Sequence, residues 1–201
     1  MRIIAGTARG RRILSVPKSL PVRPISARIK QSVFDIIRPR LPGSRFLDLF
    51  AGTGAVGLEA LSRGAEKVVF VDGDRKCVEV IGKNLERVGW KDRGQTFHAD
   101  LLQPLSWIAF RSRIEAFDLI FMGPPYKDRE KRPLTYTQTM LDNLAAAKLL
   151  APDGWLLAQH FKKEPVKAPA GFEKFRESKY GDTTVSFFRW AGYKRSELAS
   201  Q

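Results

Sequence analysis

Three glycines between two differently patterned stretches form the best candidate for a ligand-binding turn in this chain. The segment before them, F-L-D-L-F, has the composition of a buried strand, and the run 55–62 has the spacing of a helix. At Gly52, Gly54 and Gly57 a Cβ would hinder a sharp turn and a close approach of the backbone to a ligand. The following helix offers unpaired N–H groups. We therefore expect a cofactor to contact Ala51, Gly52 and Gly54; a tight turn without a ligand is the alternative.

An acid and a proline pair further along make the glycine turn part of a larger pattern. Asp72 ends the apolar run 67–71, where an acid is placed to bind ribose hydroxyls. Two features argue against NAD: Asp48 lies inside the first strand, and Gly-Pro-Pro-Tyr at 123–126 follows another apolar run. The order D-x-F-x-G-x-G, acid, P-P-Y is the layout of an S-adenosylmethionine-dependent methyltransferase acting on an amine. An NAD-dependent oxidoreductase rests on the glycine spacing alone.

Carboxylates at the strand ends suit the polar groups of S-adenosylmethionine. Ligands of open α/β sheets bind beyond the carboxyl ends of the strands. We expect Asp72 to accept from both ribose hydroxyls and Asp100 to accept from the adenine amine, with the Leu101 N–H donating to the ring. Asp48 would face the ammonium, directly or through water. The alternative for Asp48 and Asp100 is a capping or turn role.

The segment Gly123-Pro124-Pro125-Tyr126 carries the candidate catalytic residues. An exocyclic amine on a base is a poor nucleophile because its lone pair is delocalised into the ring. A Pro-Pro turn presents a backbone carbonyl without a neighbouring N–H, so it can hold that amine and orient it for transfer. Tyr126 can stack on an extruded base. The alternative is that the prolines merely end a strand.

Composition indicates a globular protein of one α/β domain with a small appendage. The 201 residues are 43% hydrophobic and 28% charged, without a signal peptide or an apolar run of transmembrane length. Cys77 is the only cysteine, which suits a reducing cytoplasm and excludes an intrachain disulfide. His98 and His160 lie on apolar strands without cysteine partners, so we expect no metal site. Because no apolar run has transmembrane length, we also expect no membrane partner.

Positive charge is concentrated at the start of the chain. Residues 1–45 hold eleven Arg or Lys and one acid, Asp35, and therefore carry +10 of the net charge of +14. This asymmetry favours a polyanion partner over a generally basic surface. The candidate RNA-binding residues are Arg9, Arg11, Arg12, Arg23, Arg28 and Lys30.

The alternation of strand and helix patterns predicts a mostly parallel sheet covered by helices on both faces. Short strands at 2–5 and 12–16 would form a basic hairpin, and a helix capped by Ser26 would run to Arg38. The predicted strands of the main sheet are 46–50, 67–71, 95–98, 117–122, 155–161, 172–179 and 183–190, the last two forming an antiparallel hairpin. The predicted helices are 55–62, 75–88, 103–111 and 136–150, with a turn at 152–154. The expected division is an RNA-binding extension at 1–44, a methyltransferase domain at 45–190 and a frayed tail at 191–201.

Nearly the whole chain resembles the RsmD-type ribosomal RNA methyltransferases. The matching motifs are M-R-I-I-A-G-x-x-R-G-R at the start, R-P-I-S-A-R-I-K-Q-S-V-F at 23–34, D-L-F-A-G-T-G-A-V-G-L-E-A-L-S-R-G-A at 48–65, P-P-Y at 124–126 and Y-G-D-T at 180–183. The resemblance implies a Rossmann-like, seven-stranded class I methyltransferase fold with an N-terminal hairpin that helps to hold RNA. It also implies methyl transfer to the exocyclic amine of a guanine in 16S ribosomal RNA, free or in an assembling small subunit.

Three positions depart from the family pattern. Gly123 stands where the family usually has Asp, Ala27 where it has an acid, and Gln159 where it has Glu. Gly123 removes a side-chain acceptor for the target amine, so we expect slow transfer to naked RNA and a faster Gly123→Asp variant. Two other functions stay open: a methyltransferase-fold protein that binds RNA but turns over slowly, and an amino-methyltransferase acting on another nucleic acid, such as adenine in DNA.

Overall fold

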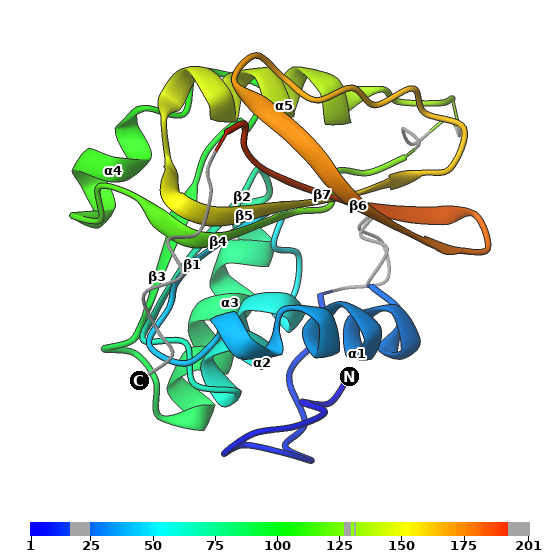
Figure 1. The fold of residues 1–201 in the computed structure, drawn as a ribbon. Helices are drawn as coiled ribbons and strands as arrows, with labels where there is room; N and C mark the ends of the chain where they lie inside the picture. Colours follow the sequence, from blue (N-terminus) through cyan, green and yellow to red (C-terminus); the bar gives the residue numbers. More distant parts are fainter. Residues whose placement is uncertain (17–24, 127–129, 131, 193–201) are drawn as a thin grey trace, which may run out of the picture.

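The computed structural model describes residues 1–16, 25–126, 130 and 132–192, and its seven named strands form one sheet (Figure 1). The strand order is β3-β2-β1-β4-β5-β7-β6. The first five strands in that order are parallel, whereas β7 runs antiparallel to both β5 and β6, as the sequence predicted. The strands are β1 (Arg45–Leu49), β2 (Lys67–Asp72), β3 (Gly94–His98), β4 (Phe117–Met122), β5 (Leu150–Phe161), β6 (Phe172–Tyr180) and β7 (Thr183–Trp190).

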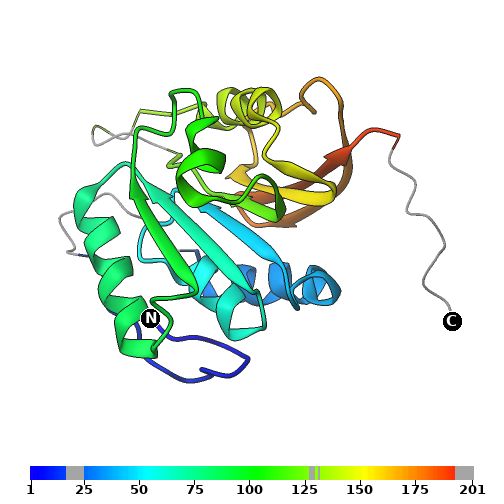
Figure 2. The same cartoon turned by 90° about the vertical axis from the view of Figure 1, so that its left-hand side faces the viewer.

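Helices cover both faces of the sheet, because the central strands are apolar on both sides. One face packs against α1 (Ala27–Ile36), α2 (Ala55–Ser62) and α3 (Arg75–Val88), and the other against α4 (Trp107–Ser112) and α5 (Tyr136–Ala147), as Figures 1 and 2 show. Two hydrophobic clusters separate along these faces. Phe46 and Leu157 belong to the first cluster, and Leu47 and Leu156 to the second. Alternate strand residues therefore serve opposite layers.

Several helix and strand boundaries differ from the predicted ones, and the causes are local. The helix capped by Ser26 ends at Ile36, and a short 3-10 turn covers Arg38–Arg40, since proline at position 39 cannot continue an α-helix. The helix predicted at 103–111 begins only at Trp107, after a proline. The predicted turn at 152–154 was wrong: these residues lie inside β5, where the register with β4 shifts between Phe117 and Leu119.

The N-terminal hairpin pairs less than the sequence predicted. Backbone pairing is limited to a bridge between Arg2 and Arg12 and a few neighbouring hydrogen bonds. The reason is competition, because the N–H groups of Ile4 and Ala5 donate instead to the carboxylate of Glu59, at 2.8 and 2.9 Å. The hairpin is therefore held to α2 rather than extended as a free ribbon (Figure 1).

The predicted division at residue 44 does not separate two hydrophobic cores. Ile3 and Ile13 of the hairpin and Phe34 of α1 belong to the same buried cluster as Leu58 of α2. The separate extension and the methyltransferase domain remain a proposal about function. The predicted frayed tail lies outside the described residues from 193 onward.

Candidate functional site

A small cavity opens at the carboxyl ends of the central strands. Its volume is about 50 Å³, and it is lined by residues from β1, the glycine turn, the start of α2 and the ends of β4 and β5. The residues that matter for chemistry are Asp48, Ala51, Gly52, Phe121, Gly123 and Gln159. The cavity is too small for a whole cofactor, which needs several hundred Å³, so it corresponds to the innermost part of a site. It brings together the glycine turn and residue 123, which the sequence predicted to share a ligand.

The turn after β1 is built from three residues with positive φ. Phe50 has φ 57°, Gly52 56° and Gly54 76°. The conformation is strained for Phe50, and such strain concentrates at ligand-binding sites. The Asn84 side chain supports the turn by donating to the Thr53 carbonyl at 3.2 Å. A side chain of α3 therefore holds the turn in place without a ligand.

Gly57 has a packing role rather than a ligand role. A Cβ at this position would lie 2.2 Å from the Phe70 ring and 2.8 Å from the side chain of Val68. The glycine therefore lets α2 pack closely against β2.

Asp72 connects the ends of two strands. Its carboxylate accepts the Gly52 N–H at 2.8 Å and the Asp74 N–H at 2.9 Å. Burial raises its pKa, although the two N–H donors partly offset this. The Cys77 thiol, a weak donor, also hydrogen-bonds to this carboxylate. A carboxylate has about four acceptor positions, so one is open to a ligand hydroxyl and a second could be gained by displacing the weak thiol donor. The thiol of Cys77 packs against Asp72, and burial raises its pKa to about 12.

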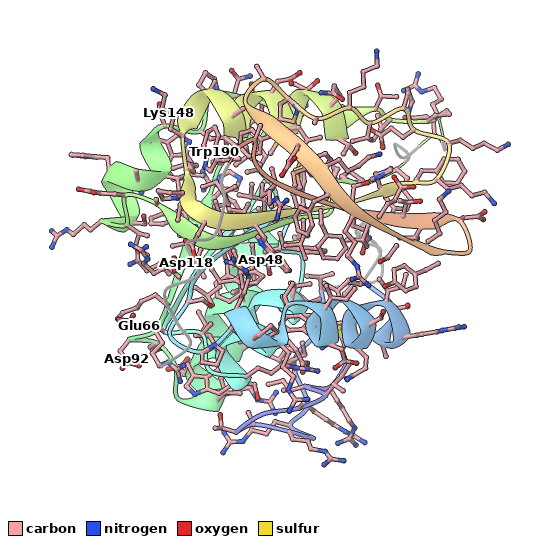
Figure 3. All side chains as sticks on the ribbon, viewed as in Figure 1. Asp48, Glu66, Asp92, Asp118, Lys148 and Trp190 are labelled. Atoms are coloured by element: carbon pink, nitrogen blue, oxygen red, sulfur yellow. The ribbon has the colours of Figure 1, made fainter. Side chains whose placement is uncertain are left out.

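Asp48 is buried beneath the turn, where Figure 3 labels it between the sheet and α2. Its Oδ2 accepts the Gly57 N–H at 2.9 Å, so the capping role that the sequence left open is present. Burial, with a smaller contribution from the Asp72 charge, raises the pKa of Asp48 to about 7. A cation in the cavity would restore the ionised form.

Asp100 and Leu101 follow β3, next to the end of β2. Asp100 is exposed and its Oδ1 accepts the Leu102 N–H at 3.0 Å, which is the turn role that the sequence left open. The backbone nearby is tied to β2, since the Ala99 N–H donates to the Asp72 carbonyl at 3.1 Å. Leu101 is buried in the layer of α4 and α5. Neither residue lines the cavity, and their contacts with adenine remain a prediction.

The Gly-Pro-Pro-Tyr segment leaves β4 at the edge of the cavity. Gly123 lines the cavity, Pro124 is buried and Pro125 is exposed. Gly123 has no positive φ, and a Cβ there would meet its nearest neighbour, Phe121, at 3.4 Å, an ordinary contact. Tyr126 lies beside Phe161, with 6.2 Å between ring centroids. Residue 123 can therefore carry a side chain without backbone strain.

The basic residues divide into two groups. Arg9, Arg11, Arg12 and Arg28 are exposed, whereas Arg23 lies outside the described residues. The expectation that Lys30 is available to RNA was wrong, because its side chain is 3% exposed and its Nζ lies 2.8 Å from the Glu59 carboxylate. The helical pattern had placed it away from the apolar stripe of α1, but the hairpin covers that side of the helix.

Phe50, Phe121 and Gln159 are among the cavity residues that sequence reasoning did not name as site components. The backbone of Phe50 carries no sequence signal for its positive φ, and Phe121 was counted only as part of an apolar strand. Gln159 was noted only as a departure from a family pattern. Its Oε1 is the one buried side-chain oxygen or nitrogen of the described residues without a hydrogen-bond partner.

The described ranges also bear on metals and membranes. In them, no group of three or more His, Cys, Asp or Glu side chains is arranged to hold a metal ion. The helices of the same ranges are too short or too polar to cross a bilayer.

Comparisons with known proteins find relatives along nearly the whole chain. The family described as "Conserved hypothetical protein 95" matches residues 1–189. YlbH of Bacillus subtilis, provisionally named an rRNA methyltransferase, is 34% identical over 96% of this chain and 100% of the relative. Ribosomal RNA small subunit methyltransferase D of Haemophilus influenzae is 29% identical over 94% of this chain and 93% of the relative. A solved structure from Escherichia coli, yhhF, superposes with a TM-score of 0.74 at 24% identity, covering 94% and 97% of the two chains.

The strand order, the glycine turn and the acid at the end of β2 define a Rossmann-like methyltransferase fold, and the solved relative shares it. Within that class the match along the chain is more specific. The chain belongs to the RsmD family, whose named members are ribosomal RNA methyltransferases.

Proposed function

We propose that the chain transfers a methyl group from S-adenosylmethionine to the exocyclic amine of a guanine in small-subunit ribosomal RNA. The observation that carries the proposal is one cavity shared by the glycine turn, Asp48 and the segment at Gly123. The names of the relatives support rRNA as the substrate class. A ribosomal substrate also agrees with the cytoplasmic location expected from the single cysteine.

The donor set fits this cofactor. Asp72 retains acceptor positions for a ribose diol beside the glycine turn, and the buried Asp48 carboxyl suits an ammonium. When bound, S-adenosylmethionine supplies an electrophilic methyl group. On the protein side, the Pro124 carbonyl would accept from the target amine and orient its lone pair, and Tyr126 would stack on the base.

The transfer needs positioning more than proton chemistry. The Pro124 carbonyl would hold the amine nitrogen while the bound cofactor would supply the methyl group and keep the electron pair of its carbon–sulfur bond. The surplus N–H proton of the amine would leave to water. No protein base is required before the bond forms. The chain's contribution is therefore to hold the amine in line and exclude competing water.

A labelled-methyl assay tests the proposal. Wild-type protein should transfer label from S-adenosylmethionine to immature small-subunit particles or to 16S RNA, and nucleoside analysis should show N2-methylguanine. Labelled adenine in DNA would favour the other nucleic-acid reading. RNA binding without label transfer would favour a weakened, RNA-holding protein, for which Gly123 is the motivating observation.

Cofactor affinity should depend on pH through Asp48. Its pKa of about 7 means that it is largely protonated at pH 6 and ionised at pH 8. Because an ammonium binds the ionised form, affinity should increase as pH rises through 7, by up to about tenfold between pH 6 and pH 8. Calorimetric titration with S-adenosylhomocysteine at both pH values checks this. In Asp48→Asn the pH dependence should flatten; a retained dependence would contradict the role of Asp48.

RNA affinity should depend on the exposed arginines of the hairpin. Deleting residues 1–16 would remove two hydrogen-bond donors of the buried Glu59, so substitution is the cleaner test. Replacing Arg9 and Arg12 with Gln should weaken RNA binding and reduce the log–log salt slope by about 0.7–0.9 for each phosphate that an arginine no longer neutralises. Filter binding across a salt series measures this.

A matched control removes equal charge near the amino ends of β4 and β5, far along the chain from the hairpin. Arg113 and Lys148 are exposed and precede β4 and β5, away from the cavity. Replacing both with Gln should leave the RNA salt slope near the wild-type value. Equal effects of the two pairs would indicate a general charge effect and exclude the hairpin as the RNA contact.

A further inference from the structure

We propose that Gln159 supplies the side-chain acceptor that Gly123 lacks, and that it holds the target amine together with the Pro124 carbonyl. The inference rests on the proposed methyl transfer and identifies a residue of that site. Nothing in the family match assigns this role to Gln159.

The position of Gln159 follows from the sheet register. Ala158 of β5 pairs with Met122 of β4, so the next residues, Gln159 and Gly123, lie side by side beyond that pair. An ideal Cβ on Gly123 would lie 3.8 Å from the Gln159 Nε2. The Gln159 amide therefore borders the space that a side chain at position 123 would enter.

The orientation of Gln159 follows from strand alternation. Leu157, two residues earlier, belongs to the cluster on the α1–α3 face, together with Phe121. Gln159 points to this same face and lines the cavity with Asp48. The next residue, His160, is turned away, and its Nε2 lies 3.0 Å from the Ser186 hydroxyl.

The hydrogen bonding of Gln159 is incomplete. Its Oε1 is buried and has no partner in the described chain. A buried acceptor without a donor is rare in native proteins and calls for a missing partner, such as a ligand. The terminal torsion of glutamine is broad and twofold, so the amide can turn its oxygen toward Gly123 without moving the rest of the side chain. An N–H donor entering the cavity would satisfy it.

The target amine has the matching chemistry. It carries two hydrogens, of which one would donate to the Pro124 carbonyl and the other to Gln159 Oε1. With both hydrogens held, the nitrogen lone pair is directed away from the two acceptors, toward the methyl donor. A neutral amide does this without placing a third carboxylate beside Asp48 and Asp72. With Gln159 in place, Gly123→Asp should be little faster than wild type, and its gain should appear mainly when Gln159 is absent.

The test combines two positions. Gln159→Leu keeps a similar size but removes the acceptor, and it should lower the single-turnover rate of methyl transfer to small-subunit particles by about 10²–10³. Its affinity for S-adenosylhomocysteine, measured by calorimetry, should equal that of wild type. Gln159→Glu retains an acceptor and should stay within about tenfold of wild type. Gln138→Leu, on α5 and away from the cavity, is the matched control and should transfer at the wild-type rate.

The decisive variant is Gly123→Asp in the Gln159→Leu background. It returns an acceptor from the neighbouring strand, and it should raise the rate of the Gln159→Leu variant by at least about tenfold. A purely structural role of Gln159 would not be rescued in this way. A wild-type rate in Gln159→Leu, or a slow double variant, would overturn the proposal while methyl transfer by wild type stands. Absence of transfer by wild type to every RNA would overturn the proposed function and this inference together.

Discussion

Replacing Glu59 with alanine is expected to lower the free energy of unfolding by about 3–5 kcal/mol. Glu59 is fully buried and ties three parts of the chain together. It forms ion pairs with Lys30 at 2.8 Å and Arg63 at 2.9 Å, and it accepts the N–H groups of Ile4 and Ala5. Alanine leaves the Lys30 ammonium buried without a counter-charge and leaves both N–H donors unpaired, which is why the destabilisation is large. Urea denaturation at pH 7 measures it.

Two comparisons separate the causes of that destabilisation. In Lys30→Met/Glu59→Gln the unpaired charge is gone and an acceptor remains, so the double variant should be more stable than Glu59→Ala. Glu86→Ala removes an acid whose pair with Lys91 is exposed, and its urea midpoint should stay near wild type. A Glu59→Ala variant as stable as Glu86→Ala would show that the buried network contributes nothing.

The same network predicts acid sensitivity. Burial alone would raise the pKa of Glu59, but Lys30, the Ile4 N–H and Arg63 hold it below its usual value. A carboxyl whose pKa is lower in the folded protein stabilises it above the unfolded pKa, near 4.5. That contribution disappears as pH falls through the lower, folded value. The hairpin should therefore loosen from α2 in acid while neutral solutions keep it docked.

The fold could be predicted from local patterns because each element carries its own signal. The apolar strands, the Ser26 cap and the αL glycine that ends α3 at Gly89 are all short-range features. The extent of the hairpin strands depends instead on a distant partner. The hairpin strands shortened because Glu59 takes their backbone donors. No periodicity near residues 4 and 5 reports an acceptor more than fifty residues away.

The candidate site likewise contains residues that local motifs predict and residues that only the tertiary structure identifies. Asp48, Gly52 and Gly123 were predicted from motifs at strand ends, and the structure brings them to one cavity. Lys30 was misjudged because a helical pattern shows which face is polar but not what covers that face. Gln159 could be found only from register and from its unpaired oxygen, both of which are properties of the assembled sheet.

Replacing Asp72 with alanine is expected to weaken binding of S-adenosylhomocysteine by about 10²–10⁴. The variant would lack the two charge-assisted hydrogen bonds that we propose between Asp72 and the ribose hydroxyls, each contributing about 1.5–3 kcal/mol. The turn would also lack an anchor, because Asp72 accepts the Gly52 N–H at 2.8 Å. Calorimetric titration measures the affinity, and NAD, titrated into wild type in parallel, should not bind.

Asp74→Ala is the matched control for Asp72. The substitution removes the same charge two residues away. It also removes the N-cap of α3, because the Asp74 carboxylate accepts the Lys76 N–H at 2.8 Å. The Asp74 side chain has no hydrogen bond to the glycine turn among the described residues. Its affinity for S-adenosylhomocysteine should stay near wild type even if its stability falls. Asp72→Asn retains one acceptor oxygen and should bind more tightly than Asp72→Ala. Equal affinity in wild type and Asp72→Ala, or tight NAD binding by wild type, would exclude Asp72 as the ribose ligand of this cofactor.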